Sequence, residues 1–325
     1  MAYSNDFTAM FGLHVPILQA PIASCATLDL VQAVGQAGGM GSLALTELPL
    51  AQCEQHITAL NALHLPYFVN YVLRFGTETV RDVAAMQPPC ITLSFGLDPV
   101  LITEIRRKGI KVGVMVGSVN GAGAAVTAGA DFLILQGMEA GGHVQASRPL
   151  TEMLSAVVAL AGAVPVVAAG GIADGADIAA AMNAGAQAVM LGTRYLATAE
   201  SLAHAQYKQA LVGAVAGDRA LTNCFDIGWP YAMHGVLRNE TFELWEAAGC
   251  PTAPDRPNEG EIILRKGDAT VVRYSDSPPM QGFVGDAMAA CLYAGTGVHR
   301  IDRIEAAGPL TTRLWSEARK LMPVT

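Results

Sequence analysis

One histidine lies in a glycine-rich loop directly after a strand-like apolar run. The run covers residues 131–136, and the loop continues through Gly141 and Gly142 to His143. Glycines beside a strand end let the backbone approach a ligand closely, because no Cβ intervenes. An imidazole in such a place can take up or release a proton near neutral pH. We therefore predict that His143 is catalytic; the alternative is that its ring only caps the loop.

Two other apolar runs also end in glycines. One is followed by Gly170 and Gly171, and the other by Gly192 and Thr193. Backbone N–H groups at such turns can hold an anion, and turns of this kind form the phosphate site of many barrels. Glycines after strands can be purely structural, but two such loops together favour a phosphate-bearing ligand. Neither loop contains a lysine, so the main chain would hold the phosphate.

These loops belong to a repeating pattern of strands and helices. The strand-like runs are residues 15–19, 40–45, 67–72, 90–95, 111–116, 131–136, 165–169 and 188–191. The helical segments that follow them are residues 27–36, 50–63, 77–86, 99–108, 120–128, 151–161, 176–184 and 201–211. Continuous apolar strands are typical of parallel sheets buried on both faces. Eight such units predict an α/β fold, a closed (β/α)₈ TIM barrel, with an open doubly wound sheet as the alternative.

The sequence changes in character after the eighth unit. Residues 213–279 hold two tryptophans and many prolines, and we predict that they form an inserted lid or second lobe. Within the lobe, residues 259–274 read as a hairpin. Residues 283–293 and 304–322 read as helices. The predicted division is a barrel of residues 1–212, to which residues 280–325 return.

Composition narrows the classes of function. The formal net charge is -8 and the hydrophobic share is 52%, which argues against a nucleic-acid partner and for a large buried core. The six cysteines form no C-x-x-C pair, so neither a metal site nor a disulfide framework is expected, and a reducing, cytoplasmic location is the simpler interpretation. There is no basic-then-apolar signal pattern at the start. The uncharged stretch 153–173 is interrupted by Pro165 and two glycines, so we expect no membrane span.

Five ordered motifs resemble the flavin-dependent nitronate monooxygenase family. They are QAPIA (19–23), AGGMGSLAL (37–45), QGMEAGGH (136–143), VVAAGGIADG (166–175) and MLGTRYLAT (190–198). The resemblance implies a barrel that binds FMN without a covalent link and uses His143 in catalysis. It also implies a set of cofactor-binding residues: Pro21, Ile22, Asn70, Gln136, Gly141, Gly142, Gly170, Gly171, Met190, Leu191, Gly192 and Thr193.

The implied reaction is oxidation of an alkyl nitronate by O₂ to a carbonyl compound and nitrite. The expected partners are therefore a small-molecule substrate and O₂, with a homodimer as a further possibility. FMN-dependent reductases of enoyl thioesters or quinones share a similar barrel and are the alternative function; a non-enzymatic flavin-binding protein is a third. The sequence departs from the family pattern at Tyr71-Val72, Val144-Gln145 and residues 294–297, which bears on the substrate more than on the cofactor.

Overall fold

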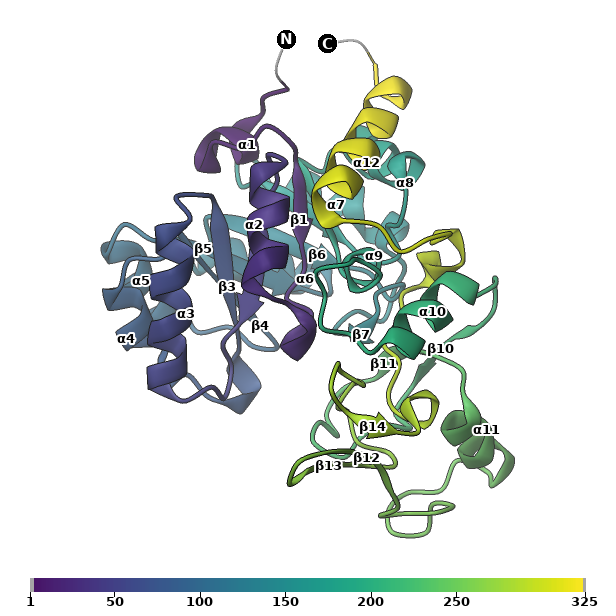
Figure 1. Ribbon diagram of the computed structural model, residues 1–325. Helices are drawn as coiled ribbons and strands as arrows, with labels where there is room; N and C mark the ends of the chain where they lie inside the picture. The colour runs from purple at the N-terminus through teal and green to yellow at the C-terminus, as the bar shows by residue number, and fades with distance from the viewer. Residues whose placement is uncertain (1–2, 324–325) are drawn as a thin grey trace.

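The barrel predicted from the repeat is present in the computed structural model, which describes residues 3–323. Eight parallel strands form one sheet in the order β1-β9-β8-β6-β5-β4-β3-β2 (Figure 1). The two edge strands meet through a parallel bridge between Leu18 and Met40, where Gln19 N–H donates to the Met40 carbonyl at 2.9 Å. The strands are β1 (Ile17–Gln19), β2 (Gly41–Ala44), β3 (Tyr67–Val72), β4 (Cys90–Ser94), β5 (Lys111–Val116), β6 (Phe132–Gln136), β8 (Val166–Ala169) and β9 (Ala188–Leu191).

Helices surround this sheet, as the sequence predicts. They are α2 (Leu28–Gln36), α3 (Leu50–Ala62), α4 (Val80–Ala85), α5 (Pro99–Arg107), α6 (Val119–Thr127), α7 (Leu150–Ala161) and α8 (Gly175–Asn183). Several begin at polar caps: the side chains of Thr27, Asp98 and Asp174 accept N–H groups of the first turn. The uncharged stretch 153–173 contains most of α7 and all of β8. Within residues 3–323, every helix is too short or too polar to span a bilayer.

The eighth unit differs from the prediction of one helix over residues 201–211. A four-residue helix, α9 (Thr193–Leu196), follows β9 at once, and α10 (Ala205–Gly213) begins later. The turn between them is held by the buried ammonium of Lys208, which donates to the carbonyls of Thr198 and Ser201 at 2.7 Å each. Residues 201–204 therefore belong to this turn and not to the start of the helix that the sequence pattern suggested.

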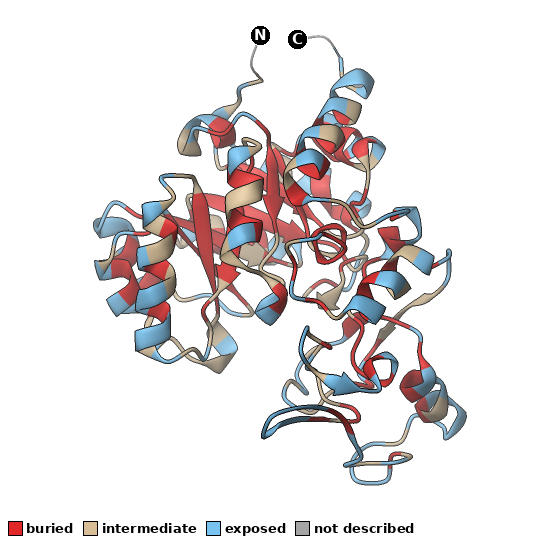
Figure 2. Cartoon of the chain, viewed as in Figure 1, coloured by how far each residue is buried: buried red, intermediate tan, exposed pale blue. Residues whose placement is uncertain are grey.

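Aromatic side chains close the amino-terminal end of the barrel. The short helix α1 (Asp6–Phe11) places Phe7 and Phe11 against Phe132, with ring centroids 5.2 and 5.8 Å apart. Phe68, Met40 and Ile134 fill the interior above them, and the strands are buried along their length (Figure 2). Because this end is packed, a ligand is expected at the carboxyl ends of the strands.

A second lobe lies beside the carboxyl ends of the strands (Figure 1). It contains β10 (Arg219–Thr222), β11 (His234–Leu237) and α11 (Glu240–Ala247). The predicted hairpin is confirmed as β12 (Ile262–Lys266) and β13 (Ala269–Val272). Strand β11 also pairs with β7 (Gly142–His143), so the lobe is joined to the loop that carries the candidate histidine.

The helix predicted over residues 283–293 is wrong. The segment instead forms β14 (Val284–Gly285), which pairs with β12, and the 3₁₀ turn η3 (Ala287–Ala289). Gly285 adopts a φ of +125°, which a right-handed helix cannot accommodate. Ala287, Ala289 and Ala290 of this segment are buried in the lobe, whereas Val284 and Met288 are exposed.

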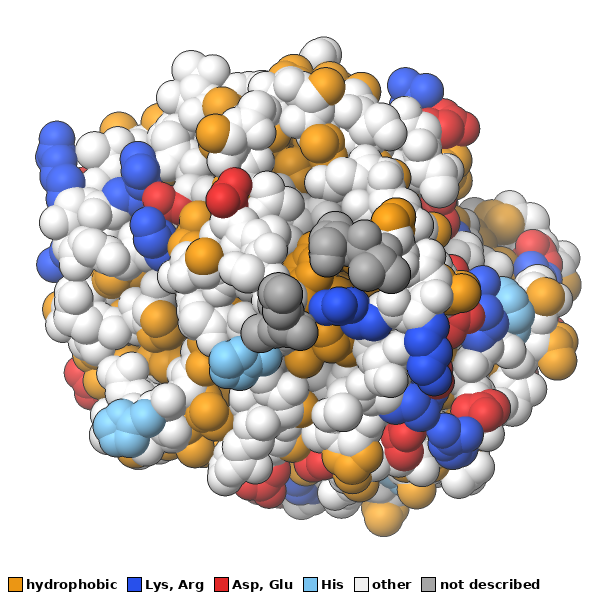
Figure 3. All heavy atoms as spheres, turned by 90° about the horizontal axis from the view of Figure 1, so that it is seen from above, with side chains coloured by type: hydrophobic (Ala, Val, Ile, Leu, Met, Phe, Trp, Pro, Cys, Tyr) orange, Lys and Arg blue, Asp and Glu red, His pale blue; other side chains and the backbone are white. Residues whose placement is uncertain are grey.

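The end of the described chain packs against the barrel. Helix α12 (Ala307–Leu321) packs against α8 and α2, and Thr311 Oγ1 lies 2.7 Å from the Tyr195 hydroxyl. Both termini therefore lie at the closed end of the barrel (Figure 1). Seen from that end, basic and acidic side chains lie beside one another (Figure 3). Among the described residues on that face, basic side chains are interspersed with acidic ones and do not gather into a broad area of the kind that binds nucleic acid.

Candidate functional site

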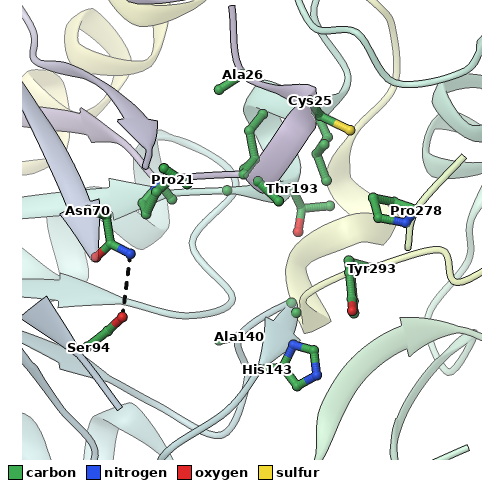
Figure 4. A pocket seen from close by; sticks show the side chains of 18 of the residues that line it. Pro21, Cys25, Ala26, Asn70, Ser94, Ala140, His143, Thr193, Pro278 and Tyr293 are labelled. Atoms are coloured by element: carbon green, nitrogen blue, oxygen red, sulfur yellow. Dashed lines mark hydrogen bonds between the residues drawn. The ribbon is translucent and has the colours of Figure 1, made fainter. Parts of the chain in front are cut away.

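A cavity of about 800 Å³ opens where the carboxyl ends of the strands meet the second lobe. Its volume lies within the range of small-molecule and cofactor sites. The side chains around it come from both parts of the fold: Pro21 and Asn70 lie on one side, and His143 and Tyr293 on another (Figure 4). The predicted site residues that line it are Pro21, Ile22, Asn70, Gln136, Gly141, Gly142, His143, Gly170, Gly171, Met190, Gly192 and Thr193.

Leu191 belongs to the predicted cofactor-binding set, but its side chain does not line the cavity. Successive side chains of a strand point to opposite faces. Met190 lies in the barrel interior and lines the cavity, whereas Leu191 is 1% exposed and packs between the sheet and the helices. Only the main chain of Leu191 is near the site, and its carbonyl already accepts the Ala20 N–H at 2.9 Å.

The glycine loops form a tightly packed cradle. Gly171 has a φ of +71°, and a Cβ there would lie 2.7 Å from Thr296 Oγ1 and 2.9 Å from Glu139 Cβ. A Cβ on Gly141 would lie 2.7 Å from the backbone nitrogen of Gly295. Glycine is therefore required at Gly171 by the backbone conformation and by close packing, and at Gly141 by close packing alone. The segment from Ala294 to Gly297, noted above for its departure from the family pattern, completes this cradle.

Two arginines contact the loops of the cradle: Arg219 donates to the carbonyls of Met138 and Ala140 at 2.7 and 2.8 Å, and Arg300 lies beside Gly171. Arg300 donates to the Gly171 carbonyl at 3.1 Å and forms ion pairs with Asp174 and Asp177. Its charge is largely compensated by these two carboxylates. The cradle therefore offers an anion mainly backbone N–H groups, as the sequence predicts for a phosphate.

Two buried amides organise the site around their strands. Gln136 donates to the His143 carbonyl at 3.1 Å and accepts the Gln145 N–H at 2.7 Å, so it holds the loop that carries His143. Asn70 accepts from Thr92 Oγ1 at 3.0 Å and donates to Ser94 Oγ at 3.4 Å (Figure 4). Each amide keeps an N–H for a ligand. Contact with the flavin stays a prediction for both residues.

His143 lies in an aromatic environment that the sequence did not indicate. Its ring stacks on Trp229 with centroids 3.9 Å apart and planes 14° apart. The rings of His234 and Tyr293 lie 5.1 and 5.6 Å away. Strand pairing sets this arrangement, because His143 in β7 is directly opposite His234 in β11.

Burial makes this imidazole hard to charge. The pKa of His143 is lowered to about 3, first by burial, then by the neighbouring His234, while a backbone group of Trp229 acts in the opposite direction. The Nε2 atom of His143 is buried and has no hydrogen-bond partner within residues 3–323. A neutral imidazole with a free nitrogen is available to exchange a proton with a ligand or hydrogen-bond it.

The sequence matches the family described as nitronate monooxygenase over residues 69–317. It is 33% identical over 307 residues to nitronate monooxygenase of Pseudomonas aeruginosa, covering 78% of this chain and 85% of the relative. The chain belongs to the nitronate monooxygenase family. It is therefore an oxidoreductase, and the resemblance seen in the five motifs is confirmed.

Two solved structures resemble this nitronate monooxygenase family member along nearly its whole length. Nitroalkane oxidase from Streptomyces ansochromogenes is 29% identical, with a TM-score of 0.79 over 98% of this chain and 99% of that one. FabK from Thermotoga maritima is 26% identical, with a TM-score of 0.81 over 98% and 97%. The barrel is thus common to both, so its shape alone does not distinguish their chemistry.

Sequence reasoning missed several residues of the site in this family member. His234 is fully buried beside His143, although nothing in the sequence singled it out among the other histidines. Trp229 and Asp276 line the cavity from the second lobe, and Tyr293 follows that lobe. Local patterns gave no signal for them, because Trp229 and Tyr293 meet the His143 ring, and Asp276 meets Gly228, only through contacts between distant segments. Cys25 also lines the cavity, and burial raises the pKa of its thiol to about 12, so the thiol stays protonated near neutral pH.

The two buried histidines predict a dependence of stability on pH. Their folded pKa values are about 3 for His143 and about 4 for His234, below the unfolded value near 6.5. The unfolded chain therefore binds more protons between these values, so their contribution to stability falls as the pH falls through that window. The carboxyl of Asp276 has the opposite effect on the pH dependence of stability. Burial raises its folded pKa to about 6, its own backbone lowers the pKa by a smaller amount, and the charge of Glu47 raises it further.

His143→Ala removes one of the two imidazoles that take up a proton when the chain unfolds in this pH range. We expect the free energy of unfolding to depend less steeply on pH in the variant, by about 1.4 kcal/mol per pH unit between about pH 4.5 and 5.5. Denaturant unfolding of both proteins at two pH values measures the difference. Equal slopes would mean that the imidazole becomes charged in the folded state at ordinary pH.

Proposed function

We propose that this protein binds FMN and oxidises alkyl nitronates with O₂, giving a carbonyl compound and nitrite. Membership of the family supports this reaction, and so does the likeness to a solved nitroalkane oxidase. The observation that carries the proposal for this chain is the neutral imidazole of His143 on a cavity that also contains the glycine cradle. A neutral imidazole and an anion-binding cradle thus share the same cavity.

The residues of the cavity fit FMN. Gly170, Gly171, Gly192 and Thr193 would hold the phosphate, because their main chain is accessible and any Cβ at Gly171 would fill the cradle. Asn70, Gln136, Pro21 and Ile22 would lie along the ring system. When bound, the flavin supplies the redox chemistry of the reaction.

The chain's own residues position and protect the substrate. His143 would take the α-proton of a neutral nitroalkane or donate a hydrogen bond to a nitronate oxygen, depending on which ring nitrogen carries the proton. Trp229, in edge contact with Phe75 and Phe95, covers the imidazole from the second lobe. These rings exclude water from the reacting atoms, which strengthens each polar contact inside the cavity.

The test is nitrite release with O₂ uptake in the presence of propyl-2-nitronate, without NAD(P)H. We expect nitrite to form in proportion to the nitronate consumed and the purified protein to show a flavin spectrum. A parallel reaction without enzyme corrects for the slow oxidation of nitronates in solution. A yellow protein that releases no nitrite from any nitronate would contradict the proposed reaction.

The likeness to FabK supports a second candidate, an FMN-dependent NAD(P)H reductase of an enoyl thioester or a quinone. The two candidates differ in the electron donor of the flavin. Anaerobic mixing with NADH would bleach the flavin rapidly in a reductase, whereas mixing with a nitronate would do so in the proposed enzyme. Comparison of the two rates in one preparation distinguishes them.

A further inference from the structure

Two carboxylates from different parts of the chain line the cavity. Glu47 follows β2 of the barrel, and Asp276 follows β13 of the second lobe. The charge of Glu47 helps to raise the pKa of Asp276, so the two groups are close enough to repel each other. Both therefore face the same space as His143.

Asp276 is placed there by the elements that surround the catalytic candidate. A Cβ added to Gly228 would collide with its carboxylate, so that group lies against the backbone directly before Trp229. The Tyr293 hydroxyl donates to the Asp276 carbonyl at 2.6 Å, and the Tyr293 ring is 5.6 Å from that of His143. The carboxylate is thus held within one residue of the ring that stacks on His143.

No cation balances these charges within the cavity. Among residues 3–323, the lining includes neither lysine nor arginine, and its remaining ionisable groups near the mouth include His56. Arg74 precedes the lining residue Phe75, but its guanidinium lies over the Tyr231 ring at 4.0 Å and is not part of the lining. A ligand that carries a second anionic group would therefore meet two carboxylates in this cavity and neither lysine nor arginine among the described lining residues.

We propose that Glu47 and Asp276 set the charge specificity of the cavity. It admits nitro compounds and nitronates that have no second anionic group and disfavours those that carry a carboxylate. This inference rests on the proposed function for the identity of the reacting group. It concerns only the part of the substrate that points away from His143.

Two three-carbon substrates provide the test in turnover. Propyl-1-nitronate carries one negative charge, and propionate-3-nitronate carries a second one at its far end. We expect wild type to have the lower kcat/KM for the doubly charged substrate. In Glu47→Gln/Asp276→Asn, the ratio of kcat/KM for the doubly charged to the singly charged substrate should rise about five- to tenfold. Glu47 is exposed, so Glu47→Gln alone should fold and raise the ratio about threefold.

A charge-matched control separates this local effect from a change in net charge. Glu54 and Asp255 are exposed and lie outside the cavity lining. Glu54→Gln/Asp255→Asn therefore removes the same charge and should leave the ratio within about twofold of wild type, because charges beyond a Debye length are screened. A ratio that is unchanged in the cavity variant, or that rises equally in the control, would overturn the proposal.

Binding provides an arm that does not depend on turnover. Calorimetric titration with 3-nitropropionate and its neutral amide, 3-nitropropanamide, compares the same nitro group with and without the carboxylate. The amide should bind wild type at least fivefold more tightly, and Glu47→Gln/Asp276→Asn should reduce that preference. If no nitronate yields nitrite, the proposed function fails, and the ratio of the two affinities alone then tests the charge specificity. Equal affinities of wild type for the amide and the carboxylate would contradict the proposed charge specificity.

Discussion

His143→Ala should lower kcat/KM for neutral nitroalkanes by about 10² to 10⁴, the usual effect of removing a general base. The same variant should lose less activity toward preformed nitronates, because their α-proton has already been removed. Stopped assays of nitrite with 1-nitropropane and with its nitronate measure both values. The difference between the two losses reports proton transfer specifically.

The change is expected to leave the fold and the flavin in place. The backbone of residue 143 makes the β7–β11 pairing and accepts from Gln136, and both interactions survive in alanine. Gly170, Gly171 and Gly192, which would hold the phosphate, lie on other loops, so FMN should be retained. His14→Ala is a matched control, because His14 is exposed and outside the cavity lining.

Two results would revise the role of His143. If the variant purifies without FMN, the imidazole acts mainly through its stack on Trp229, which would then order the site for the cofactor. If both substrates lose activity equally, the ring positions the nitronate rather than removing a proton. His143→Gln separates these cases, because an amide keeps a hydrogen-bonding group and lacks a basic nitrogen.

The barrel could be predicted because its signals are local. Residues 111–116 and 188–191 are continuous apolar runs, and both form strands with the predicted bounds. Thr27 and Asp98 mark helix starts through hydrogen bonds within one turn of the chain. The eighth helix begins later than predicted because Lys208 holds residues 198–201 in a turn, and the helix predicted over residues 283–293 is wrong because that segment pairs with β12.

The site could be predicted only on its barrel side. Glycines after strands and one histidine in their midst lie at the same end of the sheet by the topology of the fold. The residues that give His143 its properties come from the second lobe, more than 80 positions along the chain. Trp229 reaches the imidazole because β11 pairs with a two-residue strand, β7, too short to leave a pattern in the sequence.

Gly171→Ala should abolish the retention of FMN during purification. The residue adopts a φ of +71°, where a Cβ costs about 1–2 kcal/mol. The added atom would also lie 2.7 Å from Thr296 Oγ1 and 2.9 Å from Glu139 Cβ, so the loop must shift to accept it. A shift that misaligns two or three N–H donors to a phosphate should weaken FMN binding by about 10²-fold or more, since each hydrogen bond to a charged group contributes about 1.5–3 kcal/mol.

Titration of FMN into the flavin-free protein, followed by quenching of its fluorescence, measures this loss. Gly213→Ala is the matched control, because Gly213 is exposed at the end of α10 and a Cβ there meets no atom within 4 Å. Thermal unfolding of both flavin-free variants shows whether the loop strain destabilises the whole barrel. An affinity within twofold of wild type in folded Gly171→Ala would place the phosphate elsewhere in the cavity, and the assignment of the cradle would then be wrong.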